Sequence, residues 1–182
     1  MIKGVILDKS LLDIVIQRLC QQLIEKHGDF SNTALLGLQP RGVHFAERIK
    51  ERLEEILGKS VECGRLDITF YRDDFRRKET PIKANATRVP FLLEGKSVVL
   101  VDDVLFTGRS VRAAMDAMIA FGRPHRVELL VLIDRKYTRD LPIQPDYVGK
   151  QVDSMVSQKV KVDWKGVEDA EEDSVWLINE KQ

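Results

Sequence analysis

The sequence predicts an α/β domain with a mainly parallel central sheet flanked by helices. Short apolar runs of strand length alternate with segments whose apolar residues recur at helical spacing. Parallel neighbouring strands need long crossover connections, and the helical segments supply them. With 182 residues, of which 43% are apolar, the chain is expected to form one domain over residues 1–182.

Each element follows from its own pattern. The predicted helices cover residues 8–26, 43–57 and 109–121. The predicted strands cover residues 33–38, 65–71, 97–102, 126–134, 146–152, 159–164 and 175–179. Asp8 or Ser10 is expected to cap the first helix, and Gly28 and Gly58 to end the first two. Residues 72–88 carry charge and few large apolar side chains, so they predict a flexible loop.

Composition excludes several classes of function. Lys plus Arg and Asp plus Glu both number 29, so no overall field attracts a polyanion, and any RNA contact needs a local patch. No apolar run is long enough to span a bilayer, and the N-terminus lacks a secretory signal, so a cytoplasmic protein without membrane partners is expected. Cys20 and Cys63 lack the spacing of a redox or zinc site.

The stretch "VVLVDDVLFTGRS" (98–110) contains the residues that predict a ligand-binding site. By the strand-end rule for parallel sheets, Asp102 and Asp103 leave the sheet there, and "TGRS" leads into a helix whose first N–H groups favour a phosphate. Thr107 and Ser110 add hydroxyl groups, while Gly108 allows close backbone approach. The sequence contains neither a GxxxxGK loop nor a GxGxxG fingerprint to compete for this role.

Two adjacent carboxylates would repel the same phosphate, so they fit sugar hydroxyls better. The implied ligand is a 5-phosphorylated ribose. The alternative is that Asp102 and Asp103 cap the following helix and that "TG" is an ordinary turn.

This combination resembles the signature of type I phosphoribosyltransferases, which bind phosphoribosyl pyrophosphate (PRPP). The resemblance narrows to the PyrR family over residues 2–165, through "VILD", "RG", "DITFYRDD", "VDDVLFTGRSVRAAMDA", "GRP", "VLIDR", "LPI" and "DYVGK". It implies the type I phosphoribosyltransferase fold, with residues 72–88 as a flexible hood. The activity implied is that of a uracil phosphoribosyltransferase, which forms UMP and pyrophosphate from uracil and PRPP.

The resemblance also implies site residues. Catalytic roles fall to Asp102, Asp103, Arg41 and Arg72. The loop that holds PRPP and its ribose 5-phosphate comprises Val104, Leu105, Phe106, Thr107, Gly108, Arg109, Ser110 and Val111. Pyrophosphate falls to Pro40, Arg41 and Gly42, and the base to Asp134 and Arg135. Arg76, Arg77 and Lys78 are further hood candidates. Magnesium is expected mainly through PRPP's own oxygens.

Arg41 and the hood segment have an alternative interpretation as ordinary solvated loop residues. Asp134 has an alternative interpretation as a cap at the end of its strand. Purine phosphoribosyltransferases have an aspartate before "TG", whereas this chain has Phe106, which disfavours a purine base. A phosphoribosyltransferase of another base and a nucleotide-binding module that lost turnover are alternatives. A homo-oligomer is expected, because family members commonly associate.

Some PyrR proteins also bind pyrimidine-operon leader RNA in response to UMP and attenuate transcription. Two departures weaken that function here: Pro40 replaces the Thr of a typical "TRG" loop, and residues 134–143 lack the "GHRELP" pattern. Basic residues that remain available to phosphates are Arg18, Lys26, Arg109, Arg112, Arg123 and Arg126.

Overall fold

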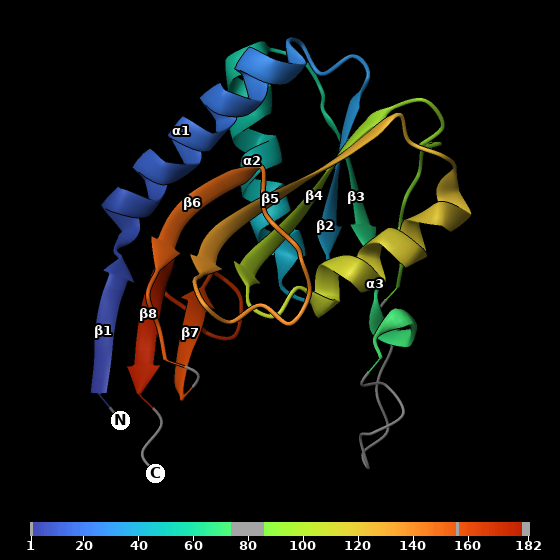
Figure 1. The fold of residues 1–182 in the computed structure, drawn as a ribbon. Coiled ribbons are helices and arrows are strands. Elements are labelled where there is room, and N and C mark those ends of the chain that lie inside the picture. The colour runs from blue at the N-terminus through green and yellow to red at the C-terminus, as the bar shows by residue number, and fades with distance from the viewer. Residues whose placement is uncertain (1, 74–85, 156, 180–182) are drawn as a thin grey trace.

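The computed structural model describes residues 2–73, 86–155 and 157–179 (Figure 1). Its elements in chain order are β1 (Ile2–Leu7), α1 (Lys9–His27), β2 (Thr33–Leu38), α2 (Gly42–Leu57), β3 (Glu62–Leu66), β4 (Ser97–Leu105), α3 (Arg109–Met118), β5 (Arg126–Arg135), β6 (Tyr147–Val152), β7 (Gln158–Asp163) and β8 (Ser174–Asn179). Short 3₁₀ turns cover Thr69–Tyr71 and Ile119–Phe121.

The predicted central sheet is confirmed as a five-stranded parallel sheet in the order β3-β2-β4-β5-β6. After β2 the chain adds β3 on one side and then returns to add β4 on the other. The crevice at the carboxyl ends of β2 and β4 is therefore a topological switch point, where ligands of such sheets bind. The "QPRG" loop leaves β2 and the "TGRS" loop follows β4, so both predicted phosphate loops flank this crevice.

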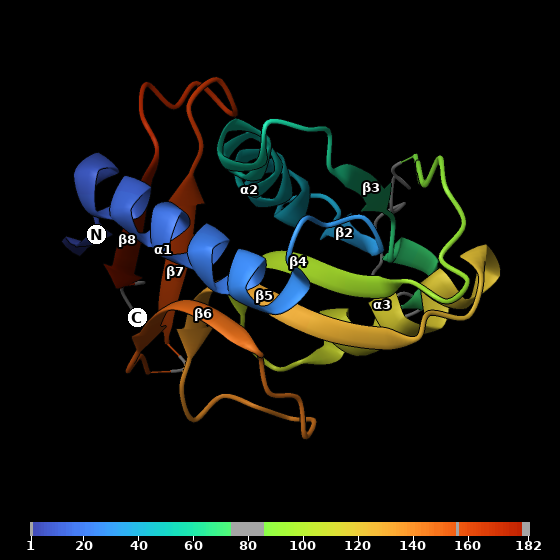
Figure 2. The same ribbon diagram turned by 90° about the horizontal axis from the view of Figure 1, so that it is seen from above.

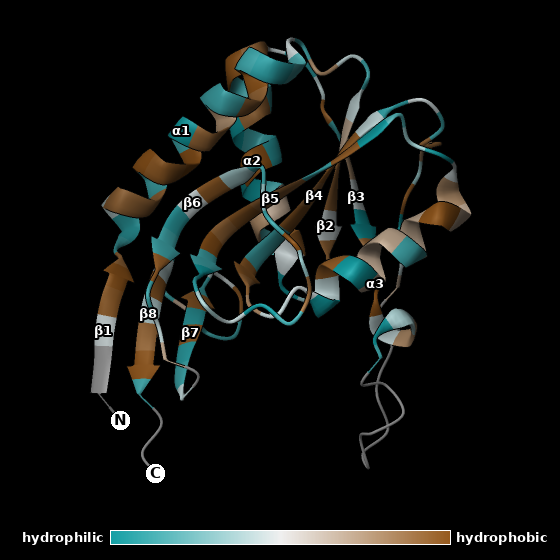
Figure 3. Cartoon of the chain, viewed as in Figure 1, coloured by the Kyte–Doolittle hydropathy of each residue, from teal (hydrophilic) through white to brown (hydrophobic). Residues whose placement is uncertain are grey.

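Helices cover both faces of this sheet, as the sequence predicts. Helices α1 and α2 pack on one face and α3 on the other (Figure 2). The strands between them are buried on both sides, and β4 and β5 are apolar along most of their length (Figure 3). Continuous apolar runs are what a parallel strand covered on both faces requires.

The caps of the first two helices match the expected residues. The Asp8 carboxylate accepts a hydrogen bond from the amide of Leu11 at 2.8 Å. The amide of Gly28 donates to the carbonyl of Ile24, and α2 ends at Gly58, whose φ of 67° suits glycine. No helix among the described residues is long and apolar enough to cross a membrane.

Two boundary predictions are wrong. The strand expected over residues 65–71 instead covers Glu62–Leu66. It ends there because the Asp67 carboxylate accepts from the amide (3.0 Å) and hydroxyl (2.6 Å) of Thr69 and turns the chain. Strand β4 continues to Leu105, so Asp102 and Asp103 lie within its last residues and not beyond its end. Asp102 is paired with Val131 of β5.

A second sheet was not anticipated from the sequence. Strands β1, β8 and β7 form an antiparallel sheet in that order. Trp164, at the end of β7, is buried and stacks on Phe45 of α2, with ring centroids 5.8 Å apart. Arg48 lies over the Trp164 ring at 4.6 Å and forms two 2.7 Å hydrogen bonds to Asp173. These contacts hold the small sheet against α2.

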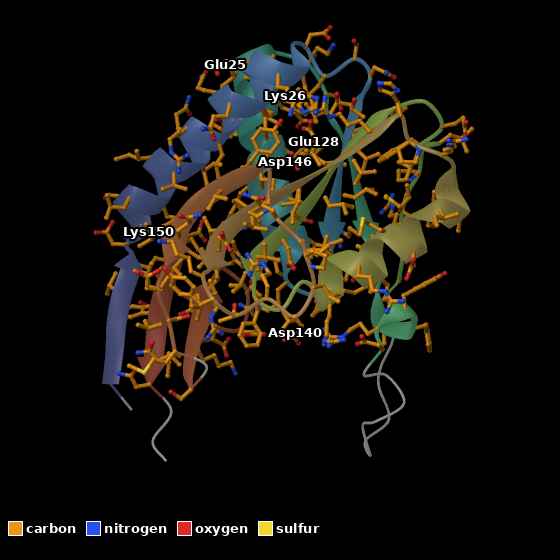
Figure 4. All side chains as sticks on the ribbon, viewed as in Figure 1. Glu25, Lys26, Glu128, Asp140, Asp146 and Lys150 are labelled. Carbon is orange, nitrogen blue, oxygen red and sulfur yellow. The ribbon has the colours of Figure 1, made fainter. Side chains whose placement is uncertain are left out.

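A buried polar cluster closes the opposite, amino edge of the main sheet. Glu128 of β5 accepts hydrogen bonds from Tyr147 at 2.7 Å and pairs with His27 at 2.8 Å and Lys26 at 2.6 Å. Figure 4 shows Lys26 and Glu128 together at this edge, far from Asp140 at the carboxyl edge. Its paired charges make this cluster a structural link between α1, β5 and β6.

Candidate active site at the carboxyl edge of the sheet

A pocket of about 180 Å³ lies at the carboxyl end of β4. Its lining residues are Arg72, Asp102, Val104, Leu105, Phe106, Thr107, Gly108, Arg109, Ser110 and Val111. All ten were selected from the sequence, nine of them from the single stretch that joins β4 to α3. The structure therefore brings together the hood residue Arg72, the first acid and the whole predicted ribose-phosphate loop.

The loop presents the N-terminus of α3 to this pocket. Gly108 precedes the helix with φ 90°, in the left-handed region that favours glycine. A Cβ at Gly108 would lie 2.9 Å from Ile143 Cγ1, so packing also requires a glycine. No side chain of the described residues caps α3 at Gly108, which contradicts the alternative that Asp102 or Asp103 caps it; the Thr107 hydroxyl accepts a long, 3.4 Å hydrogen bond from the Arg109 amide. The uncapped N-terminus carries partial positive charge and suits an anion.

The two acids have different surroundings. Half-buried Asp102 lines the pocket, and burial raises the pKa of its carboxyl well above the usual range, with the neighbouring Asp103 charge raising it further. Arg72 lines the same pocket, and its positive charge lowers the pKa of Asp102 to a smaller extent. Buried Asp103 also has a raised pKa, through burial, and the Arg41 guanidinium partly offsets this increase.

The "QPRG" loop joins β2 to α2 and approaches β4 closely. A Cβ at Gly42 would lie 2.5 Å from the carbonyl oxygen of Val101 and 3.0 Å from Asp102 Oδ1, so only glycine fits there. The Gln39–Pro40 peptide is cis. The Arg41 side chain turns to protein acceptors: Nε lies 3.2 Å from Asp103 Oδ2 and a terminal nitrogen lies 3.2 Å from Glu168. Arg41 also donates to the carbonyl of Val162.

The start of the hood is tied to α3. Asp73 pairs with Arg109 and lies 3.9 Å from Arg112. Arg109 also donates to Asp140 at 3.1 Å, so it joins the hood and the β5–β6 loop to the start of α3. The remaining hood candidates Arg76, Arg77 and Lys78 lie outside the described residues.

The predicted base residues lie at the end of β5, where Asp134 is paired with Leu105 of β4. Both Asp134 and Arg135 are buried. The Arg135 guanidinium stacks on the Phe106 ring at 4.2 Å and donates to Ser154 at 2.8 Å. Burial lowers its pKa. Arg135 therefore positions Phe106 at the pocket wall.

Sequence reasoning missed Arg139, which holds this region together. Its guanidinium donates to the carbonyls of Phe106 (2.6 Å) and Ile143 (3.0 Å) and pairs with Asp134. The amide of Asp140 adds a 3.0 Å hydrogen bond to the carbonyl of Thr107. An arginine in a loop of mostly polar residues has no hydrophobic periodicity around it. The only sequence signal here was that residues 134–143 depart from the family pattern.

Comparison with known proteins agrees with this geometry. Residues 5–166 match the family model described as "Phosphoribosyl transferase domain". A hypoxanthine phosphoribosyltransferase of Trypanosoma cruzi superposes with a TM-score of 0.71 at 15% identity, over 97% of both chains. One from Staphylococcus aureus gives a TM-score of 0.65 at 17% identity, over 86% of this chain and 80% of that one. At these identities the structural likeness establishes the fold, and with the family match it defines a type I phosphoribosyltransferase.

Similarity to curated relatives identifies the family within the type I phosphoribosyltransferases. A protein of Listeria monocytogenes named "Bifunctional protein PyrR" is 44% identical over 181 residues, which are 98% of this chain and 97% of the relative. Its namesake in Acetivibrio thermocellus is 49% identical over 161 residues, 88% of this chain and 86% of the relative. The chain belongs to the PyrR family, and the resemblance seen in its motifs is confirmed.

Proposed function

We propose that this protein is a uracil phosphoribosyltransferase that forms UMP and pyrophosphate from uracil and PRPP. The pocket at the end of β4 carries this proposal, because it joins a carboxylate, Asp102, to the uncapped N-terminus of α3. A ribose 5-phosphate has hydroxyl groups that can donate hydrogen bonds to Asp102 and a phosphate that can bind at the N-terminus of α3. PyrR relatives with near-complete coverage support the same assignment.

The reaction transfers a ribosyl group, so pyrophosphate leaves C1 as uracil bonds to it. Positive charge develops on the ribose, and catalysis depends on stabilising the departing anion and holding the base in line. We assign the 5-phosphate to the 107–111 loop and the ribose hydroxyls to Asp102 and Asp103. Arg41 and Arg72 face the leaving group in this scheme, with Gly42 letting the backbone approach it.

Magnesium fits this donor set as a partner of PRPP. Among the described residues no group of three or more His, Cys, Asp or Glu side chains is arranged to hold a metal ion. Mg²⁺ keeps several of its waters and commonly binds through substrate phosphates, so PRPP's own oxygens are its expected ligands here, and Asp102 and Asp103 stay assigned to the ribose hydroxyls. When bound, it would neutralise charge on pyrophosphate.

We place the uracil ring between Phe106 and the end of β5, near Asp134 and Arg135. Phe106 lines the pocket and is 36% exposed although it stacks on Arg135, so part of its apolar ring surface is open to the site. An aromatic side chain offers stacking to a flat base but no carboxylate for a purine. The base pocket therefore favours a pyrimidine.

The direct test is an assay of the purified protein with PRPP, Mg²⁺ and one of uracil, orotate, hypoxanthine or guanine. Release of pyrophosphate with uracil and not with the two purines is expected. Orotate alone as substrate would move the assignment to another base. Turnover with none of the four, in protein that still binds PRPP, would favour a nucleotide-binding module.

A second function is favoured by the word "Bifunctional" in the names of the relatives. We propose that the chain also binds pyrimidine-operon leader RNA when UMP is bound, with its basic residues as phosphate contacts. Several of them already have protein partners: Lys26 and Arg126 pair with Glu128, and Arg109 and Arg112 with Asp73. This engagement predicts weaker RNA binding than the number of basic residues implies.

The RNA function is tested by measuring affinity for the protein's own operon leader with and without UMP, at fixed salt. Tighter binding to the leader than to an unrelated hairpin of equal length, strengthened by UMP, is expected. Equal affinity for both RNAs would exclude sequence-specific attenuation. Light scattering of the same samples tests the expected homo-oligomer.

A further inference from the structure

A second pocket, of about 260 Å³, lies at the β3 edge of the main sheet. It is bounded by α2, β3 and the segment that returns toward β4, which Figure 2 shows beside one another. Its lining residues are Val43, Glu47, Lys50, Cys63, Gly64, Arg65, Arg88 and Pro90. None of them lines the pocket at the end of β4.

Two arginines of this second pocket are direct cross-strand neighbours. The amide of Arg65 donates to the carbonyl of Arg88 at 2.8 Å, and the amide of Arg88 donates back to Arg65 at 2.8 Å. In such an antiparallel bridge the two side chains lie on the same side of the sheet, and like charges there are destabilising. Arg65 is paired with Glu47, whereas Arg88 has no ion-pair partner among the described residues.

The remaining charges keep the pocket positive. Lys50 is 3.3 Å from Glu54, one turn further along α2, and both side chains are partly exposed, so this helix pair is weak. Burial raises the pKa of the Cys63 thiol to about 11, so this side chain brings no negative charge at neutral pH. Arg65 and Lys50 each have a carboxylate partner, so Arg88 is the cation of this pocket without one among the described residues, and its unbalanced charge is a reason for an anion to bind.

We propose that this second pocket binds a small phosphate-bearing anion, held by Arg65 and Arg88 with Lys50 nearby. One arginine guanidinium can donate two parallel N–H bonds to phosphate oxygens, so two adjacent arginines offer several donors to a single phosphate group. The pocket encloses about 260 Å³, which is room for orthophosphate or pyrophosphate, the two anions tested below.

The second pocket adjoins both segments that frame the proposed pyrophosphate loop. Val43 directly follows Gly42, and Arg88 lies two residues after Ala86, whose carbonyl accepts a 2.6 Å hydrogen bond from Gln39. An anion bound to Arg88 therefore stabilises the segment around Ala86 and, through Gln39, the proposed pyrophosphate loop. The resulting effect on turnover rests on the proposed function, whereas anion binding itself does not.

Cys63 provides a reporter that is independent of catalysis. It lines the second pocket and is partly exposed, while Cys20, the other cysteine of the chain, is fully buried. Alkylation of Cys63 by iodoacetamide, followed by mass spectrometry, is measured with orthophosphate, pyrophosphate or chloride at equal ionic strength. Either phosphate should slow it saturably, by about tenfold at about ten times its dissociation constant. Chloride should not.

Variants separate this pocket from anion binding elsewhere. Arg88→Gln and Arg65→Gln should abolish the protection, and Glu47→Gln, which removes the competing carboxylate, should make half-protection occur at lower anion concentration. Arg112→Gln, on exposed α3, should leave protection unchanged. Stronger protection by pyrophosphate than by orthophosphate would identify the reaction product as ligand, and equal protection would identify any phosphate group. No protection by either anion, or undiminished protection in Arg88→Gln, would overturn the proposal.

Discussion

Arg41 Nε lies 3.2 Å from Asp103 Oδ2, so the cation proposed to face pyrophosphate is held by an acid proposed to face ribose. Glu168, from the β7–β8 turn, occupies another nitrogen of the same guanidinium at 3.2 Å. PRPP therefore competes with two carboxylates for Arg41. The buried partner Asp103 is part of the proposed ribose site, whereas the exposed Glu168 has no proposed role there, so its removal is informative.

Removing Glu168 should improve PRPP binding. Its side chain is 64% exposed, and exposed ion pairs contribute roughly 0.2–1 kcal/mol. Glu168→Gln is therefore expected to lower the KM for PRPP by up to about fivefold, with kcat little changed. Steady-state kinetics at fixed salt measure this, with Glu171→Gln as a charge-matched control in the same turn. A raised KM would show that Glu168 aids binding by positioning Arg41.

Gly42→Ala should damage both stability and activity. The new Cβ would lie 2.5 Å from the Val101 carbonyl, which is a backbone atom that cannot move aside cheaply. Overpacking of this kind costs about 1–3 kcal/mol, measured as the free energy of unfolding in urea. The displaced loop should also reduce kcat/KM for PRPP. Gly4→Ala, where a Cβ meets nothing within 4 Å, is the control and should match the wild type.

The sequence located this site because its signals are local. Nine of the ten lining residues come from one strand–loop–helix stretch, in which apolar run, acids, Gly108 and helical period are all contiguous. Periodicity also placed α1, α2 and the parallel strands. What it missed depends on tertiary contacts: the β1–β8–β7 sheet pairs the two ends of the chain, and the partners of Arg41 come from β4 and the β7–β8 turn.

The predicted strand ends were wrong where polar side chains compete with, or are compatible with, the hydrogen bonds between strands. Asp67 ends β3 by binding Thr69, although "RLDITFY" alternates as a strand does. The opposite error occurred at β4, where two adjacent acids suggested a strand end. The ladder continues through them because Asp103 is compensated by Arg41 and Asp102 opens onto the pocket.

The raised pKa of Asp102 gives a prediction for stability against pH. An acid whose folded pKa exceeds its usual 3.8 favours the folded state when protonated, so the wild type should lose stability as pH rises from about 4 toward that folded pKa. In the Asp102→Asn variant the side chain at this position stays uncharged at every pH, so the variant does not lose stability in this pH range. Its Tm should therefore exceed that of the wild type near neutral pH, while uracil turnover falls by about a hundredfold or more.

Thermal melts across the pH series test this, with exposed Asp116→Asn as a control that should follow the wild type. The double variant Asp102→Asn with Asp103→Asn should show the same loss of turnover and an intact circular dichroism spectrum. If that double variant kept the wild-type rate, the ribose role of both acids would be rejected.

Arg139 should position the base side of the site without touching substrate. Its side chain is 22% exposed and holds the carbonyl of Phe106 and the carboxylate of Asp134. Arg139→Ala leaves buried Asp134 without its cation, so the free energy of unfolding should fall by about 1.5–3 kcal/mol. The KM for uracil should rise more than the KM for PRPP, because Phe106 loses its shortest carbonyl contact and keeps only those to Thr138 and Arg135, whereas Arg139 makes no hydrogen bond or ion pair with the α3 N-terminus among the described residues.

The matched control is Lys136→Ala in the same loop, where the lysine makes only a 3.4 Å pair with Asp153, an exposed residue. It should change stability by less than about 0.5 kcal/mol. Arg139→Lys should fall between the two, because lysine restores the charge beside Asp134 but lacks the planar fork that reaches the carbonyls of Phe106, Arg135 and Ile143. Equal rises of both KM values in Arg139→Ala would show a general loosening of the site, and would refute a specific role for Arg139 in holding the base side.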